Sequence, residues 1–186
     1  MARRAADRLE RADDFFAECA DVHRTLNKIE HLFAEENIAY AVIGGMAMNI
    51  HGFKRVTNDV DLLTTSAGLD TIHRRLVGRG YLFDGTQKRL RDLETGVIID
   101  ILVREGSPDP VKRAGHHVLP LPKLIDLKLA SGLAAADRIK DLADVQELIK
   151  ALELPRDLGE ELDSSVRDEY YRLWDAAQNG WDPSAG

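Results

Sequence analysis

The sequence predicts an α/β (α+β) protein with a mixed β-sheet flanked by helices and followed by a C-terminal helical bundle. Three observations support this fold class. Apolar, strand-like runs are confined to the middle of the chain, and helical periodicity occupies both the segment before residue 38 and the segment after residue 119. The chain has 186 residues, of which 44% are hydrophobic and 31% charged, so it can bury a core as one domain or as one domain with a helical appendage.

The N-terminal segment reads as helix followed by a buried strand. Over residues 3–37, apolar side chains recur at three- and four-residue spacing, most clearly at the four positions Val22, Leu26, Ile29 and Phe33. Ala39–Ile43 is a short apolar run closed by Gly44-Gly45, which predicts a strand that ends in a tight turn. Met46–His51 is long enough for one or two helical turns.

The central segment alternates strands with one helix. Asp59–Thr65 reads as the second strand, and Leu69–Val77 as an amphipathic helix ended by glycines. A hairpin is expected around Asp84-Gly85, because Asp-Gly suits a turn that requires positive φ. After a turn at Thr95-Gly96, the β-branched run Val97–Val103 gives the strongest strand signal in the chain.

The last third is predicted to be helical. Pro122–Ala135 and Asp137–Leu152 are periodic stretches separated by a polar break, Pro155 ends the second, and Asp157–Ala177 forms a third. The expected organisation is N-terminal helices over residues 1–37, a core over 38–118, a C-terminal helical region over 119–178 and a frayed tail over 179–186.

Composition excludes several classes of protein. No apolar run approaches the roughly 20 residues of a membrane span, and the charged N-terminus has no secretory signal pattern. The single cysteine, Cys19, cannot form an internal disulfide, so a cytoplasmic protein is expected. The net charge of −7 comes wholly from residues 135–186, which disfavours indiscriminate binding of nucleic acid. The basic run Arg74–Arg91 is either a solvated surface or a local patch for a polyanionic substrate.

Three carboxylates stand out because each lies inside an apolar strand. Asp59 and Asp61 are two residues apart, so a strand places both on one face, while Asp100 lies among isoleucines and leucine. A carboxylate there is costly unless it is hydrogen-bonded, ion-paired or bound to metal. If the two strands are neighbours, the three side chains converge on an oxygen-rich site of the kind that Mg²⁺ prefers. The alternatives are a strand-start aspartate that caps a turn, with an exposed neighbour, for the pair, and a buried structural aspartate bonded to arginine or backbone for Asp100.

The glycine pair at the end of the first strand is a candidate phosphate site. Gly44 and Gly45 let the backbone approach a phosphate chain, and a following helix N-terminus adds N–H donors. Arg55 and Thr57, just before the acidic pair, are either ordinary loop residues or phosphate contacts. Lys128 is either a lysine whose stem packs along a helix or a triphosphate contact, and its replacement is expected to change stability little.

These motifs resemble a known superfamily. Ile43-Gly44-Gly45, a gap of thirteen residues and Asp59-Val60-Asp61 are similar to the signature of the DNA polymerase β-type nucleotidyltransferases, and the run around Asp100 resembles the strand with their third carboxylate. Lys128-Leu129-Ala130-Ser131 and Lys140-Asp141-Leu142-Ala143-Asp144 resemble the C-terminal part of the AbiEii-type proteins, many of which are toxins of toxin–antitoxin pairs. The resemblance covers about residues 38–152. This sequence differs from the family pattern at Gly45, where polymerising members often have serine, and at Arg138, which is displaced from the usual arginine position.

The resemblance implies a nucleotidyltransferase that moves a nucleoside monophosphate from an NTP, such as ATP, to a hydroxyl. Asp59, Asp61 and Asp100 would be the catalytic metal ligands for Mg²⁺ or Mn²⁺, and Lys128 would be catalytic and nucleotide-binding. Gly44, Gly45, Arg55 and Thr57 would bind the nucleotide. The acceptor would be RNA such as tRNA, a protein or a small molecule, and an antitoxin would be the partner. The alternative is a non-catalytic member of the fold that acts as a nucleotide sensor or binds a protein. Asp141 and Asp144 are expected to cap a helix or form ion pairs.

Overall fold

The computed structural model describes residues 20–106, 108–135 and 138–178, which fall into two compact units. The described part of the first unit comprises residues 20–50, 54–106 and 108–118, and that of the second comprises residues 51–53, 119–135 and 138–178. The mixed sheet with flanking helices and a helical C-terminal region confirms the predicted fold class. Every helix in the described residues is too short or too polar to span a membrane.

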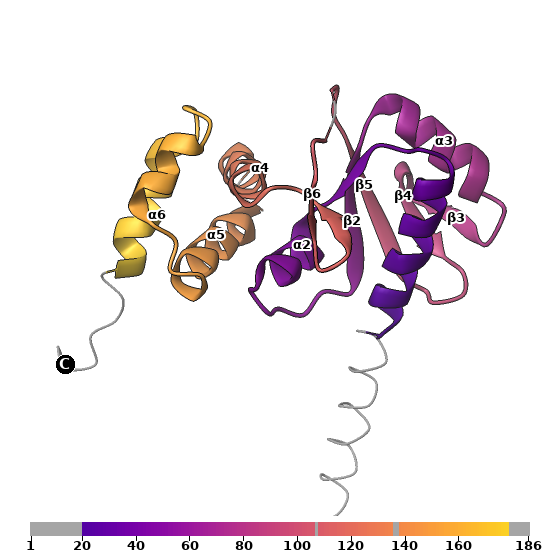
Figure 1. The fold of residues 1–186 in the computed structure, drawn as a ribbon, viewed down its shortest axis with the longest axis horizontal. Coiled ribbons are helices and arrows are strands. Elements are labelled where there is room, and N and C mark those ends of the chain that lie inside the picture. Colours follow the sequence, from indigo (N-terminus) through magenta and orange to yellow (C-terminus); the bar gives the residue numbers. More distant parts are fainter. Residues whose placement is uncertain (1–19, 107, 136–137, 179–186) are drawn as a thin grey trace, which may run out of the picture. The chain divides into compact units, whose positions relative to one another are not determined.

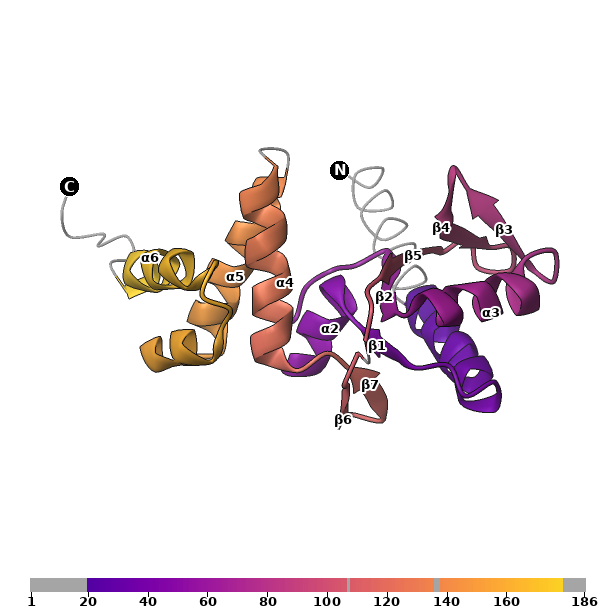
Figure 2. The ribbon, with the colours of Figure 1, turned by 90° about the horizontal axis from the view of Figure 1, so that it is seen from above.

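The first unit is built on a seven-stranded mixed sheet (Figure 1). Its strands lie in the order β3-β4-β5-β2-β1-β7-β6, which Figure 2 shows from another side. The pairs β2–β5 and β1–β7 are parallel and the others antiparallel. The strand bounds are β1 Tyr40–Val42, β2 Asp59–Thr64, β3 Tyr81–Asp84, β4 Thr86–Asp92, β5 Ile98–Val103, β6 Val111–Arg113 and β7 His116–Val118.

Helices cover both sides of this sheet. The N-terminal helix, described over residues 20–35, and α3 (Ser66–Leu76) lie on one side, and α2 (Gly44–His51) lies on the other (Figure 1). The N-terminal helix buries the apolar positions that its periodicity predicts, Val22, Leu26, Ile29 and Phe33. The predicted helix over residues 3–19 lies outside the described residues.

Local sequence signals explain where α3 and the β3–β4 hairpin form. Thr65 caps α3, because its side chain accepts a hydrogen bond from the Gly68 N–H at 3.1 Å. Gly68 is required there, since a Cβ at this position would lie 2.2 Å from the Thr64 Oγ1. The hairpin turns at Gly85 with φ of +80°, as the Asp84-Gly85 pair predicts.

The second unit is helical and differs from its prediction in one respect. Helices α4 (Leu121–Ala134) and α5 (Ile139–Ala151) occupy the predicted stretches. The predicted single helix over residues 157–177 is wrong, because the chain forms a 3₁₀ helix, η2 (Arg156–Glu161), and a separate helix, α6 (Arg167–Gln178). Between them, Asp163 turns the chain by accepting hydrogen bonds from the backbone N–H and the hydroxyl of Ser165.

The core of the helical unit is anchored by polar groups of aromatic side chains. Tyr170 is fully buried and donates its hydroxyl to the Pro155 carbonyl at 2.9 Å. The Trp174 indole N–H donates to the Leu154 carbonyl at 2.8 Å. These bonds attach α6 to the end of α5 and satisfy polar groups that burial would otherwise penalise.

Candidate functional site

The three predicted carboxylates come together on one face of the sheet. Parallel pairing of β2 with β5 places Asp61 directly beside Asp100, and the two-residue alternation puts Asp59 on the same face as Asp61. One carboxylate oxygen from each of the three residues lies within 4.8 Å of the others. All three side chains are partly exposed, so solvent and a ligand can reach them.

The opposite face of the same strands forms the core, which explains why the carboxylates are held in position. Val60 and Leu62 of β2 and Ile99 and Ile101 of β5 are buried, with at most 4% of each residue exposed. A one-residue shift in register would move these apolar side chains to the carboxylate face, so burial fixes the pairing of Asp61 with Asp100.

Gly44 lies against the Asp61 side chain at the start of α2. A Cβ built on Gly44 would lie 1.8 Å from the Asp61 Oδ2, and the residue has φ of +62°. The Ile43 N–H donates to the Asp61 carbonyl at 2.9 Å, which fixes the end of β1 beside β2. The first turn of α2 therefore begins next to the carboxylates.

Gly45 makes room for Thr57. A Cβ on Gly45 would lie 2.7 Å from the Thr57 Oγ1 and 2.9 Å from its Cβ. The Thr57 hydroxyl donates to the Asp59 Oδ1 at 2.7 Å and thereby orients that carboxylate. A serine in place of Gly45 would require Thr57 to move, so the packing of Thr57 favours glycine at this position.

Arg55 lies in the loop that leads to β2 and is tied to α2. Its backbone N–H donates to the Asn49 Oδ1 at 2.7 Å, and the Asn49 amide donates back to the Arg55 carbonyl at 2.9 Å. This reciprocal pair positions the loop that contains Thr57. The nucleotide-binding roles assigned to Arg55, Thr57, Gly44 and Gly45 stay predictions.

Lys128 belongs to the helical unit, where it is buried and ion-paired. Its ammonium nitrogen lies 2.7 Å from the Asp144 Oδ2 and 3.1 Å from the Asp141 Oδ1, and 8% of the side chain is exposed. Ser131 also donates to the Asp141 Oδ2 at 2.7 Å. The ion pairs expected for Asp141 and Asp144 are confirmed, and the catalytic role assigned to Lys128 stays a prediction.

Arg89 is a neighbour of the carboxylates that was not predicted from the sequence. Antiparallel pairing of β4 with β5 places Arg89 opposite Asp100, and the Arg89 Nε lies 3.8 Å from the Asp100 Oδ1. The turn predicted at Thr95-Gly96 could have revealed this pairing, because a hairpin folded about that turn brings the two positions together.

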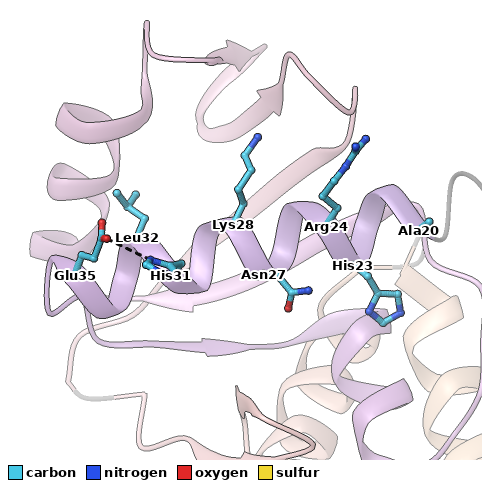
Figure 3. A pocket seen from close by; sticks show the side chains of 8 residues that line it. All are labelled: Ala20, His23, Arg24, Asn27, Lys28, His31, Leu32 and Glu35. Atoms are coloured by element: carbon cyan, nitrogen blue, oxygen red, sulfur yellow. Dashed lines mark ion pairs between the residues drawn. The ribbon is translucent and has the colours of Figure 1, made fainter.

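The described residues also contain a hollow unrelated to the carboxylates. It has a volume of about 870 Å³ and lies along the exposed face of the N-terminal helix, where His31 pairs with Glu35 at 3.3 Å (Figure 3). Lys28 of the N-terminal helix contacts Asp92 of β4. Side chains alternate along a strand, so Asp92 points to the opposite face from Arg89, which is paired with Asp100. The N-terminal helix therefore covers the side of the sheet away from the carboxylates. The hollow is therefore separate from the candidate site.

The three carboxylates fit a small divalent cation. Mg²⁺ binds oxygen ligands at about 2.1 Å, so two ligands on opposite sides of one ion lie about 4.2 Å apart. The spread of up to 4.8 Å among the Asp59, Asp61 and Asp100 oxygens is close to that value. The donor set contains only carboxylate oxygen, which suits Mg²⁺ or Mn²⁺ better than a softer metal.

Comparisons with solved structures find distant likenesses. A candidate nucleotidyltransferase from Thermotoga maritima is 21% identical with a TM-score of 0.44, and the match covers 65% of this chain and 91% of that one. A candidate nucleotidyltransferase from H. pylori is 16% identical with a TM-score of 0.45, covering 76% and 86%. JHP933 from Helicobacter pylori is 15% identical with a TM-score of 0.47, covering 91% of each chain.

No protein-family model and no curated protein sequence matches the chain. The structural likenesses are too distant to assign an activity, which therefore has to be inferred from the geometry of the site.

Proposed function

We propose that this protein is a divalent-metal-dependent nucleotidyltransferase that moves a nucleoside monophosphate from an NTP to a hydroxyl of an acceptor. The observation that supports this most strongly is the convergence of Asp59, Asp61 and Asp100 beside the glycine turn that begins α2. Three carboxylates in one partly exposed place repel one another, and a structural role alone does not require them.

Asp59 and Asp61 would hold the metal, and Asp100 would share it and orient the acceptor hydroxyl. Bound Mg²⁺ or Mn²⁺ would neutralise charge on the triphosphate and on the departing pyrophosphate. The acceptor oxygen forms a bond to the α-phosphorus, the bond from that phosphorus to the bridging oxygen of the β-phosphate breaks, and pyrophosphate leaves. Asp100 accepts the hydrogen bond of the attacking hydroxyl, whose proton passes to solvent.

The start of α2 would bind the triphosphate. Gly44 and Gly45 bring backbone close to the carboxylates, and the N–H groups of the first helical turn can donate to phosphate oxygens. Thr57 would act by orienting Asp59, and Arg55 would add a cation from the same loop. The motif resemblance alone implies a catalytic and nucleotide-binding role for Lys128, and loss of transfer in Lys128→Ala would support that role.

The proposal includes the biological role that the AbiEii-type resemblance implies. The protein would be a cytoplasmic toxin that modifies RNA such as tRNA, or a protein, and a cognate antitoxin would oppose it. Induced expression should then arrest growth, while Asp100→Asn should not. Equal arrest by both proteins would contradict a toxin role based on this site.

The activity can be tested with each of the four NTPs labelled at the α-phosphate. The protein is incubated with Mg²⁺ and total cellular RNA and protein, and the products are separated on gels. Transfer of label by wild type and its loss in Asp61→Asn and Asp100→Asn would support the proposal. Asp70→Asn, which removes an exposed carboxylate from α3, is the matched control and should behave as wild type. Absence of label on both RNA and protein would favour the non-catalytic alternative.

A further inference from the structure

Strand β4 presents two arginines on the carboxylate face of the sheet. In the β4–β5 register Arg89 is opposite Asp100 and Arg91 is opposite Ile98, while Leu90 between them is fully buried. Because side chains alternate along a strand, both arginines share the face of Asp100. Their side chains are 47% and 48% exposed, so both can meet a ligand.

The two guanidinium groups are oriented by carboxylates and backbone. Arg91 donates to the Asp84 Oδ2 at 2.9 Å and to the Gly96 carbonyl at 3.2 Å, which fixes its direction. The Arg89 Nε lies 3.7 Å from the Asp84 Oδ2 and 3.8 Å from the Asp100 Oδ1, and both distances exceed a hydrogen bond. Arg89 is thus held near Asp100 by charge, with its N–H donors still able to bind an anion.

The order of strands separates two sides of the candidate site. Gly44 follows β1 and lies against Asp61 on β2, whereas Arg89 lies on β4, beyond β5 (Figure 2). If the triphosphate binds at the start of α2, the acceptor approaches Asp100 from the β4 side. The arginines of β4 therefore lie on the acceptor side.

Other basic residues of the same sequence run lie elsewhere. Arg74 and Arg75 belong to α3, which covers the opposite side of the sheet, and their side chains contact Thr71 and Glu36 respectively. The basic run thus does not form one patch. Arg89 and Arg91 are the two of its members that β4 places on the face of Asp100.

We propose that Arg89 and Arg91 form a phosphate-binding subsite on the acceptor side, so that the acceptor is a nucleic acid strand with a hydroxyl that reaches Asp100. The inference rests on the proposed function and narrows its acceptor. Guanidinium forks match phosphate oxygens in charge and geometry. A protein side chain or a neutral small molecule would offer these two exposed arginines no anion beyond the carboxylates that they already contact.

The subsite can be tested by binding alone, in the absence of NTP. Fluorescence anisotropy is measured with a labelled 12-nucleotide RNA and with DNA of the same sequence, in Mg²⁺ at several salt concentrations. Arg89→Gln and Arg91→Gln should each weaken binding about tenfold, as for loss of one charge-assisted hydrogen bond. Each should also reduce the slope of log affinity against log salt by about 0.7. Arginine-dependent binding of the RNA, of the DNA or of both would support the subsite, and the comparison identifies which nucleic acid it binds.

The control variant is Arg74→Gln, which removes the same charge from the other side of the sheet and should bind as wild type. Unchanged binding in both β4 variants, or an equal loss in Arg74→Gln, would overturn the subsite. Transfer of label to protein, unaffected by Arg89→Gln, would overturn it while leaving the proposed function intact. Arginine-dependent binding of the strand without any nucleotide transfer would refute the proposed function alone.

Discussion

The Asp61 carboxylate packs directly on the Cα of Gly44. A Cβ at Gly44 would lie 1.8 Å from the Asp61 Oδ2 and 2.5 Å from its Cγ, far inside contact distance. Gly44 also has φ of +62°, in the left-handed region that side chains disfavour. The absence of a side chain at residue 44 is therefore what lets this carboxylate reach its position beside Asp100.

Gly44→Ala should destabilise the protein more than a glycine replacement that meets only backbone strain. Gly85 has φ of +80° with open space around its Cα, so Gly85→Ala should cost about 1 kcal/mol of unfolding free energy. Gly44→Ala adds the clash with Asp61 and should cost about 3 kcal/mol or more. Urea denaturation of the two variants measures the difference in unfolding free energy. Equal losses of unfolding free energy would mean that the position of the Asp61 carboxylate does not require glycine at residue 44.

Removing one carboxylate should abolish metal binding without harming the fold. Asp59→Asn keeps an oxygen that can accept the Thr57 hydroxyl and relieves repulsion within the cluster. We expect the metal-free variant to melt at or above the wild-type temperature. Mn²⁺ at 100 times the wild-type Kd should stabilise wild type by about 2.7 kcal/mol but leave the variant unchanged. Unfolding of Asp59→Asn without metal would instead indicate a structural role.

The Thr57 hydroxyl should affect metal binding through Asp59. Thr57→Val keeps the shape of the side chain but removes the donor that holds the Asp59 Oδ1 at 2.7 Å. Loss of such a supporting hydrogen bond typically lowers metal affinity by about tenfold or more. Calorimetric titration with Mn²⁺ measures the change, and Thr57→Ser should restore wild-type affinity. Equal affinities in Thr57→Val and wild type would show that the hydroxyl does not orient Asp59.

Lys128 should matter for stability, contrary to what the sequence alone suggests. Lys128→Met would leave Asp141 and Asp144 without their buried cation, at a cost of about 3 kcal/mol or more in unfolding free energy. Lys123→Met should cost little, because 65% of that side chain is exposed and its contact with Asp126 is 3.6 Å long. Melting curves of the two variants test this, and similar melting temperatures would show that the two ion pairs contribute nothing.

Acid should weaken the attachment of the N-terminal helix to the sheet. Burial opposes the charge of Asp92, but the Glu94 N–H and the Lys28 ammonium outweigh it and hold the pKa of Asp92 below its ordinary value. A depressed carboxyl pKa stabilises the fold above the ordinary aspartate range, and this stabilisation is lost as pH falls through the lowered pKa. The free energy of unfolding should therefore decrease as the pH drops below about 4, and this decrease should be smaller in Asp92→Asn than in wild type. Parallel curves for Asp92→Asn and wild type would exclude Asp92 as the cause.

The same contact predicts a loss of stability in strong base. The pKa of Lys28 is raised although burial alone would lower it, because its ammonium group donates to Glu94 and Asp92. A lysine whose pKa is raised in the folded protein stabilises the fold at every pH up to the ordinary lysine range. This stabilisation is lost as the pH rises through the higher pKa. Lys28→Met should therefore remove part of the decline in stability above about pH 10.5, measured by urea denaturation. An unchanged decline would attribute it to other groups.

Local patterns were sufficient to predict most of the fold and the members of the carboxylate cluster. Periodicity identified the buried face of the N-terminal helix, and alternation placed Asp59 and Asp61 on one face of β2. The hairpin of β6 and β7 was missed, because each strand has three residues and carries no clear alternation. The break between η2 and α6 was missed because Asp163 and Ser165 make a turn within an otherwise helical pattern.

Contacts between distant residues could not be predicted from local patterns. The sequence suggested that the glycines at 44 and 45 let the backbone approach a phosphate, and that role stays a prediction. What local patterns could not show is that the two glycines also make room for the Asp61 and Thr57 side chains. The sequence left Lys128 as either a packed helical lysine or a triphosphate contact, and its pairing with Asp141 and Asp144 becomes visible only when α4 and α5 are packed together. Each of these relationships depends on which elements pack together.

The class of reaction is tested most directly by comparing two labels on the same NTP. Wild-type protein is incubated with Mg²⁺, cellular RNA and protein, and an NTP labelled at either the α- or the γ-phosphate. Nucleotidyl transfer predicts acceptor labelled from the α-phosphate only, with γ-label recovered in pyrophosphate and no transfer by Asp100→Asn. Acceptor labelled from the γ-phosphate, or equal α-labelling by wild type and Asp100→Asn, would contradict the account.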